Sequence, residues 1–305
     1  MAAPANSEQT YTEAWLPGRD GIKFYTRTYK ASPARAVVIH CHGFAEYIAR
    51  YEWAHGVYAS RGITVFAFDQ RGFGLTALDL KNKSKDSKYG KTSWHDQFAD
   101  IEWWLKYMKD QYPTLPVFLM GHSMGGALCL GFVTRPSPPP AEESVKLVSG
   151  VVATSPLILL TNPPLRIARF LGMLASHILP TLVIPAPVNP DNLSHDKEMN
   201  AANARDPLCP QKGSVKGVHD MLTGGEQMLW NDYKNWNSDV PVLIVHGTAD
   251  QVTSSSASKE FCDKISAKDK EYLPIEDGYH ELVNESNGMK EKFVDDCISW
   301  ILKHV

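Results

Sequence analysis

The sequence predicts an α/β fold in which a mostly parallel sheet is flanked by helices on both faces. Short apolar runs of strand length alternate along the chain with longer stretches of helical periodicity, and this alternation is typical of a covered parallel sheet. The length of 305 residues suffices for one such domain with an insertion. We predict parallel strands at 36–41, 63–68, 117–121, 147–153, 241–246 and 271–275, with helices between them at roughly 47–60, 93–111, 124–134, 254–266 and 288–303.

The two ends of the chain fit the same plan. Two strand-like segments joined by residues 17–21 predict a hairpin ahead of the first parallel strand. The last helix carries Met289, Phe293, Cys297 and Ile301 at four-residue spacing, which indicates one face turned toward the core.

A serine in the middle of the chain has the setting of a catalytic nucleophile. Residues 121–125 are Gly-His-Ser-Met-Gly, directly after the apolar run 117–120 and before the stretch 124–134, which we interpret as an amphipathic helix. A serine between strand and helix lies on a strained turn that exposes its hydroxyl, and glycines two residues away avoid a collision across the bend. Ser123 is therefore the predicted nucleophile, since strand and helix make an ordinary loop serine the weaker interpretation.

A serine hydroxyl needs a base and an orienting acid, and in this architecture the acid follows the serine in the chain and the base follows the acid. Asp250 comes after the predicted strand 241–246, at the sheet edge where α/β folds place their chemistry. His246 lies in that strand and is interpreted as a packed core residue. Asp250 is the predicted acid.

The base is expected in the loop after the last strand. His280 follows residues 272–275 and a glycine, so its ring can lie over the sheet edge. Asp277 competes weakly for the acid role, because it is too near His280 in sequence to approach from a separate strand. His280 would take the proton of Ser123, and Asp250 would fix the imidazole tautomer.

Two backbone amides are predicted to stabilise the oxyanion of the tetrahedral intermediate. One is the amide of Met124, directly after the nucleophile, and the other belongs to the loop after an earlier strand. That strand is 36–40 and its loop is 42–44, which nominates the amide of Phe44.

The chain resembles the monoacylglycerol lipases of the α/β-hydrolase superfamily over nearly its whole length. The His-Ser-Met centre, Glu46 and the DPL sequence at 206–208 narrow the resemblance to these lipases and their lysophospholipase-like relatives. The motifs that carry it are HGFAEY (42–47), FDQRGFG (68–74), PVFLMGHSMGG (116–126), NLSHDKEMNAANARDPL (192–208), VPVLIVHGTAD (240–250) and DGYHELVNE (277–285).

The resemblance implies an α/β-hydrolase fold and carries the triad over to Ser123, Asp250 and His280, with oxyanion amides at Phe44 and Met124. It also implies that Glu46 and Arg50 bind the glycerol head group. An equal alternative is that Glu46 stabilises the first turn of a helix and pairs with Arg50 at i, i+4. The family usually has glycine where this chain has Ala45, and a positive φ there would strain the alanine.

Residues 157–230, which we call the cap, interrupt the alternation between the core segments 1–156 and 231–305. The expected cap helix 164–175 is apolar nearly all round, with only two arginines. These apolar residues form either the cap's own core or an acyl-chain tunnel and an interfacial surface. We favour the second interpretation, because each buried methylene of an acyl chain contributes roughly 0.8 kcal/mol to binding.

Composition restricts the partners. The net charge is −3, from 31 basic and 34 acidic residues, and gives no sign of the basic surface that binding to nucleic acid needs. There is no secretory signal peptide at the N-terminus and no apolar run of membrane-spanning length, so we expect a cytoplasmic protein, with peripheral attachment to membranes or lipid droplets through the cap. Reduced thiols fit that compartment, and the five cysteines are scattered, at Cys41, Cys129, Cys209, Cys262 and Cys297.

The resulting hypothesis is a serine hydrolase that cleaves monoacylglycerols to fatty acid and glycerol through an acyl-serine, with no metal or cofactor. Its substrate would be a monoacylglycerol or a similar single-chain acyl ester. The first alternative is a lysophospholipase or broad carboxylesterase with the same triad. An amidase or aminopeptidase is disfavoured by the greasy cap, and an epoxide hydrolase by the serine at the nucleophile position. A non-catalytic binding protein is the alternative from another class.

Overall fold

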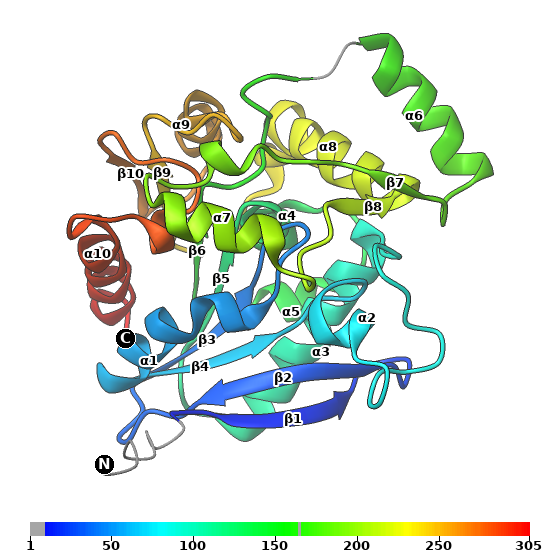
Figure 1. Ribbon diagram of the computed structural model, residues 1–305. Coiled ribbons are helices and arrows are strands. Elements are labelled where there is room, and N and C mark those ends of the chain that lie inside the picture. Colours follow the sequence, from blue (N-terminus) through cyan, green and yellow to red (C-terminus); the bar gives the residue numbers. More distant parts are fainter. Residues whose placement is uncertain (1–9, 164–165) are drawn as a thin grey trace, which may run out of the picture.

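An eight-stranded sheet forms the middle of the molecule (Figure 1). The computed structural model describes residues 10–163 and 166–305, without the side chains of 166–171. The strand order is β1-β2-β4-β3-β5-β6-β9-β10; β2 is antiparallel to both of its neighbours and the other neighbouring pairs are parallel. The strands are β1 Thr12–Pro17, β2 Lys23–Tyr29, β3 Ala36–Cys41, β4 Ile63–Phe68, β5 Val117–His122, β6 Gly150–Thr154, β9 Val242–Gly247 and β10 Lys270–Ile275.

Helices cover both faces of the sheet, as the alternation predicted. Successive residues of a strand point to opposite faces; on β3, Val37 and Ile39 join one buried cluster while Val38 joins the other. The first cluster packs against α3 Trp94–Gln111, α4 Met124–Thr134 and α9 Ser255–Lys264. The second packs against α1 Glu52–Ser60 and α10 Met289–Lys303. Shorter helices are η1 Ile48–Tyr51, α2 Gly74–Leu78, α5 Glu142–Val145, η3 Asp232–Asn235 and η4 Leu282–Asn284.

Two sequence predictions about local structure are wrong. The strand predicted at 147–153 begins only at Gly150, because the residues before it form hydrogen-bonded turns, with Leu147 N donating to Ser144 O and Val148 N to Val145 O. The helix at 124–134 is present, but it is not amphipathic. Every residue of α4 is buried, since the helix lies beneath the cap as well as against the sheet.

The cap residues lie between β6 and β9 and cover the carboxyl ends of the central strands (Figure 1). The predicted cap helix 164–175 corresponds to α6, which is described from Arg166 to Ile178; residues 164–165 of that prediction lie outside the described residues. The cap elements are α6 Arg166–Ile178, β7 Val183–Pro185, η2 Pro190–Asn192, α7 Lys197–Arg205, β8 Lys212–Ser214 and α8 Val215–Trp230.

All five cysteines are buried and unbridged. Among the helices described, none combines the length and the apolar character needed to cross a bilayer.

Candidate active site

Ser123 occupies a strained turn between β5 and α4. Its backbone has φ 52° and ψ −117°, a region that non-glycine residues rarely occupy. The flanking glycines are required by contact: a Cβ on Gly121 would lie 2.3 Å from Gly125 O, and one on Gly125 would lie 2.1 Å from Cys41 O. The turn is therefore as tight as the motif predicted.

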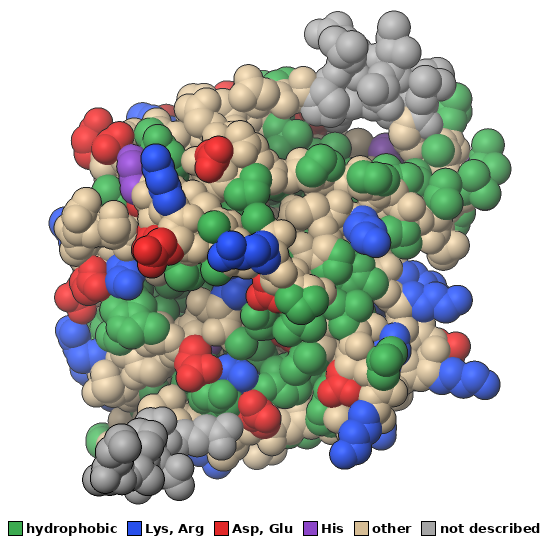
Figure 2. Space-filling view, in the orientation of Figure 1, with side chains coloured by type: hydrophobic (Ala, Val, Ile, Leu, Met, Phe, Trp, Pro, Cys, Tyr) green, Lys and Arg blue, Asp and Glu red, His purple; other side chains and the backbone are tan. Residues whose placement is uncertain are grey.

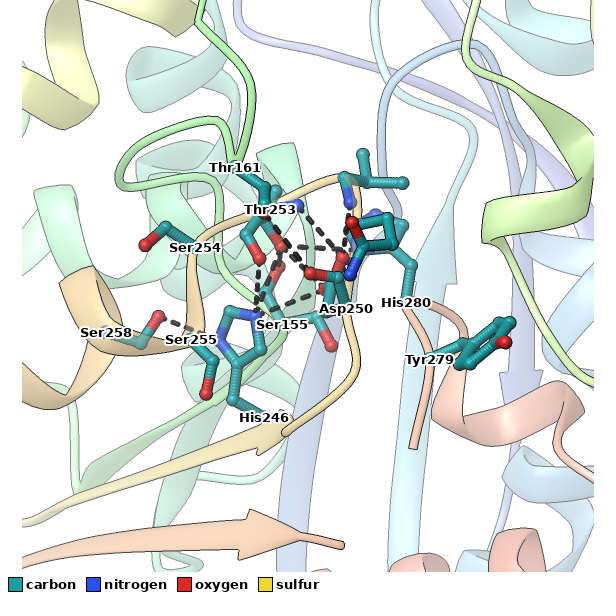
Figure 3. Close-up of polar contacts among 12 residues, drawn as sticks. Ser155, Thr161, His246, Asp250, Thr253, Ser254, Ser255, Ser258, Tyr279 and His280 are labelled. Atoms are coloured by element: carbon teal, nitrogen blue, oxygen red, sulfur yellow. Dashed lines mark hydrogen bonds and ion pairs between the residues drawn. The ribbon is translucent and has the colours of Figure 1, made fainter. Parts of the chain in front are cut away.

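His280 and Asp250 meet across two loops of the sheet edge. His280 Nδ1 lies 2.8 Å from Asp250 Oδ2, and both side chains are buried. Figure 3 shows Asp250 between the rings of His280 and His246. Asp277 is not the partner of His280, because its side chain is 76% exposed and lies beside His195.

Asp250 is held on every side. Its Oδ1 accepts the backbone N–H groups of Val252 and Thr253 at 2.7 and 2.9 Å. Its Oδ2 accepts the hydroxyl of Thr253 at 2.9 Å and lies 3.1 Å from His246 Nε2. His246 is fully buried, as predicted, yet it also orients the carboxylate, which a core interpretation alone did not anticipate.

The His280–Asp250 pair shifts both pKa values toward the charged forms. Burial alone would lower the pKa of His280, but the attraction and hydrogen bond of Asp250 outweigh it, so the pKa of His280 is raised above its ordinary value. Burial would raise the pKa of Asp250, yet His280 and His246 hold that pKa far below the ordinary range. Asp250 is thus a carboxylate at neutral pH.

Ser123 and His280 line the same cavity, with Asp250 behind the imidazole. We call this cavity the site cavity. From the core it is also lined by Phe44, Glu46 and Glu281. The cap contributes Val188, Pro190, Leu193, Asn203, Ala204 and Gln211. The fold therefore brings residues that are far apart in the sequence together at one edge of the sheet, as predicted.

The loop after β3 lies against Ser123. A Cβ on Gly43 would stand 3.3 Å from Ser123 Cβ. His42 holds this loop, with Nε2 accepting Gln70 N at 2.8 Å and Nδ1 2.8 Å from Gly43 O. The backbone amides of Phe44 and Met124 donate to no described residue, so both remain available to a ligand oxygen. Ala45 has φ 55°, which is the strained conformation foreseen at this position.

Glu46 and Arg50 belong to a buried ion network rather than to an exposed helical pair. Glu46 precedes η1, so the expectation that it lies in a first helical turn is wrong, whereas its expected i, i+4 pairing with Arg50 is present. Arg50 lies between two carboxylates, with Nε 3.4 Å from Glu46 Oε2 and Nη2 2.5 Å from Glu281 Oε2. Glu46 Oε1 also accepts the hydroxyl of Tyr51 at 2.6 Å and the backbone N–H of Gly43.

Burial raises the pKa of Glu46 to about 7, although Arg50 acts in the opposite direction. Sequence reasoning missed Glu281 in this network. The position of Glu281 directly after His280, at the same sheet edge as Glu46, could have indicated its place in the network.

The cap is hydrogen-bonded to the loop that carries His280. Glu281 N donates to Leu193 O at 2.7 Å, and Ser194 Oγ donates to Asn284 O at 2.8 Å. Glu285 accepts from both sides, taking His195 N at 3.0 Å and Tyr279 N at 2.7 Å. Cap residues 193–195 therefore form one unit with the loop of His280.

Comparison with known proteins assigns the family. Residues 32–287 match the family model described as serine aminopeptidase, S33. A putative monoglyceride lipase of Schizosaccharomyces pombe is 32% identical over 88% of this chain and 68% of the relative, and the monoglyceride lipase of Saccharomyces cerevisiae is 27% identical over 99% and 96%.

The crystal structure of a soluble variant of the Saccharomyces cerevisiae monoglyceride lipase, in complex with a substrate analogue, superimposes with a TM-score of 0.85. The two chains share 26% identity, and the match covers 100% of this chain and 99% of that one. The predicted α/β-hydrolase fold is confirmed, and the chain belongs to the monoglyceride lipase family of α/β-hydrolases.

Proposed function

We propose that this chain cleaves monoacylglycerols to a free fatty acid and glycerol, with Ser123 as nucleophile, His280 as base and Asp250 as orienting acid. The observation that carries the proposal is the shared cavity of Ser123 and His280, with Asp250 bonded to the far nitrogen of the imidazole. A neutral imidazole bonded in this way presents its other nitrogen to the serine as an acceptor.

In the first half of the reaction, His280 takes the proton of Ser123 while Oγ attacks the ester carbon. The amides of Phe44 and Met124 donate to the oxyanion, each worth about 3 kcal/mol in the transition state. His280 then returns the proton to the departing glycerol oxygen and leaves an acyl-serine. In the second half, water attacks the acyl carbon, loses its proton to His280 and releases the acid.

The charges around the site cavity favour a glycerol ester over a lysophospholipid. Arg50 is bonded to Glu46 and Glu281, so its charge is already matched and a phosphate at the head-group end would meet two carboxylates. Glycerol hydroxyls suit such a mixed set of donors and acceptors. The same pairing makes both carboxylates poor receptors for a charged amino terminus, which argues against aminopeptidase chemistry.

We also propose that the cap contacts a lipid surface. Exposed apolar side chains gather at the upper right of Figure 2, where Figure 1 draws the end of α6, and a cap that only filled its own core would not expose them. They are Leu174, Ile178, Leu179, Leu182 and Val183.

Two measurements test the function. A fluorophosphonate probe should label the wild-type protein at Ser123 and leave Ser123→Ala unlabelled, with Ser60→Ala as a control at an exposed helix end. Rates on mono-, di- and triacylglycerols and on a lysophospholipid of equal chain length should be highest for the monoacylglycerol. Absence of labelling would favour a binding protein, and a preference for the lysophospholipid or the triacylglycerol would overturn the substrate assignment.

A further inference from the structure

A second cavity lies behind the active site, between the sheet and helices α1 and α10. We call it the inner cavity. Its volume is about 20 Å³, and a cavity needs roughly 10–15 Å³ to admit one water molecule. His122 lines both the inner cavity and the site cavity, so the two cavities adjoin at this side chain.

The inner cavity is apolar except for a few ring nitrogens and hydroxyls. His55 is 2% exposed, and neither of its ring nitrogens has a hydrogen-bond partner in the described part of the chain. His40 Nδ1 likewise has no hydrogen-bond partner among the described residues. Leaving one buried polar group unpaired costs about 1–3 kcal/mol. The remaining wall includes Val38, Ala54, Val65, Met120, Phe293 and Val294, which offer no hydrogen bond.

The polar wall of the inner cavity leads to the base. The ring of His55 lies 4.7 Å from that of His40, and His40 lies 4.3 Å from Tyr51. Tyr51 lies 6.4 Å from His122, whose ring lies 4.7 Å from His280. Burial lowers the pKa of His40, His55 and His122, so each ring is neutral at pH 7 and offers one donor and one acceptor.

Hydrolysis of an acyl-serine needs one water beside His280, at a moment when the acyl chain fills the space under the cap. We infer that the inner cavity binds water between His55 and His40 and delivers it past His122 to the acyl-serine. In that step the water oxygen bonds to the acyl carbon, the bond from the acyl carbon to Ser123 Oγ breaks, and the water proton passes through His280 to Ser123. This inference rests on the proposed esterase function.

The test separates the two halves of the reaction. Val38→Ile adds a methylene on the face of β3 that lines the inner cavity, and His55→Phe removes the two nitrogens. Val37→Ile is the matched control, because it adds the same atoms on the opposite face of the same strand. Rapid-quench kinetics with p-nitrophenyl palmitate, whose long acyl chain fills the space under the cap, then give acylation and deacylation rate constants for each variant.

Val38→Ile should displace the water from the inner cavity, and His55→Phe should remove a hydrogen-bond partner of that water. We expect each to slow deacylation about tenfold, with acylation within about twofold of wild type. Val37→Ile should keep both rate constants.

Unchanged deacylation in both variants, or an equal fall in acylation and deacylation, would overturn the inference while leaving the esterase function intact. If either variant fails to fold, a crystal structure of the wild type decides: ordered water bonded to His55 supports the inference and a dry cavity overturns it. Failure of the function itself looks different, because wild-type protein would then form no acyl-enzyme at Ser123.

Discussion

At the scale of the residue, Asp250 is the most tightly constrained group of the site. Two backbone amides, one hydroxyl and two imidazoles contact its two oxygens. The carboxylate therefore needs no rearrangement when the imidazolium forms beside it, and this preorganisation is a main source of enzymatic rate enhancement.

Replacing Asp250 by asparagine should lower kcat by about 10³–10⁴-fold, because the amide favours the wrong tautomer of His280. Steady-state kinetics on a monoacylglycerol measure the change, and thermal unfolding checks that the variant is folded. Near-normal turnover in Asp250→Asn would mean that the acid is another residue.

With His280 as the proposed base, its raised pKa should set the acid limb of the pH profile. The base acts only when neutral, so kcat/KM should fall on acidification with a midpoint above 6.5. The His280–Asp250 pair also stabilises the fold, and this contribution depends on pH in the opposite direction to kcat/KM. It is fully present below pH 6.5 and is lost as pH rises through the raised pKa of His280. The pH dependence of kcat/KM measures the midpoint.

Glu46→Gln is the control for this assignment, because the pKa of Glu46 also lies near 7. The limb should persist in that variant. A midpoint at or below 6.5, or loss of the limb with Glu46, would contradict the assignment to His280.

Ala45 is a residue whose substitution should increase stability. A left-handed conformation costs an L-residue roughly 1–2 kcal/mol, and glycine avoids this cost. We expect Ala45→Gly to raise the free energy of unfolding by about 1 kcal/mol, measured by urea denaturation. A decrease would show that the buried methyl group contributes more to packing than its backbone loses in strain.

At the scale of the element, glycines decide how the cap helices dock. A Cβ on Gly225 of α8 would lie 2.2 Å from Ile158 O, whereas one on Gly172 of α6 would meet no atom within 4 Å. Gly225 is therefore the point at which α8 approaches the chain leaving β6.

Alanine at these two positions should have opposite effects. The methyl group of Gly225→Ala should push α8 away from Ile158 and lower the free energy of unfolding by about 1–3 kcal/mol. Gly172→Ala raises helix propensity and should increase the free energy of unfolding by up to about 1 kcal/mol. Thermal unfolding of the two variants checks the contrast, and equal effects would contradict it.

The sequence predicted the fully buried strands, but it did not predict the short exposed elements of the cap or the contacts between loops. The strands 36–41 and 63–68 match residue for residue, because all their side chains are buried and most join the two clusters on the opposite faces of the sheet. The cap elements β7 and α7 were not predicted, since both are short and largely exposed. Among the site residues, the second bond to Asp250 from His246 and the network of Glu281 were missed, because no local pattern records a contact across loops.

At the scale of the whole molecule, the exposed end of α6 predicts a measurable affinity for lipid. Replacing Ile178 and Leu182 together by serine should weaken binding to phosphatidylcholine vesicles about tenfold, roughly 1.4 kcal/mol. Cosedimentation measures the binding. Leu80→Ser is the matched control, because Leu80 is 90% exposed but lies outside the cap; if it has the same effect, the cap has no special role at the lipid surface.

The fastening of residues 193–195 to the loop of His280 has a consequence for how any ligand arrives. If these cap residues lifted away from the core, their hydrogen bonds to Glu281, Asn284 and Glu285 would break, and the loop that positions His280 beside Asp250 would lose that support. We therefore expect ligands to enter elsewhere along the cap. A crosslink that pins residues 193–195 to the loop of His280 should leave turnover intact, whereas a backbone cut there should lower it.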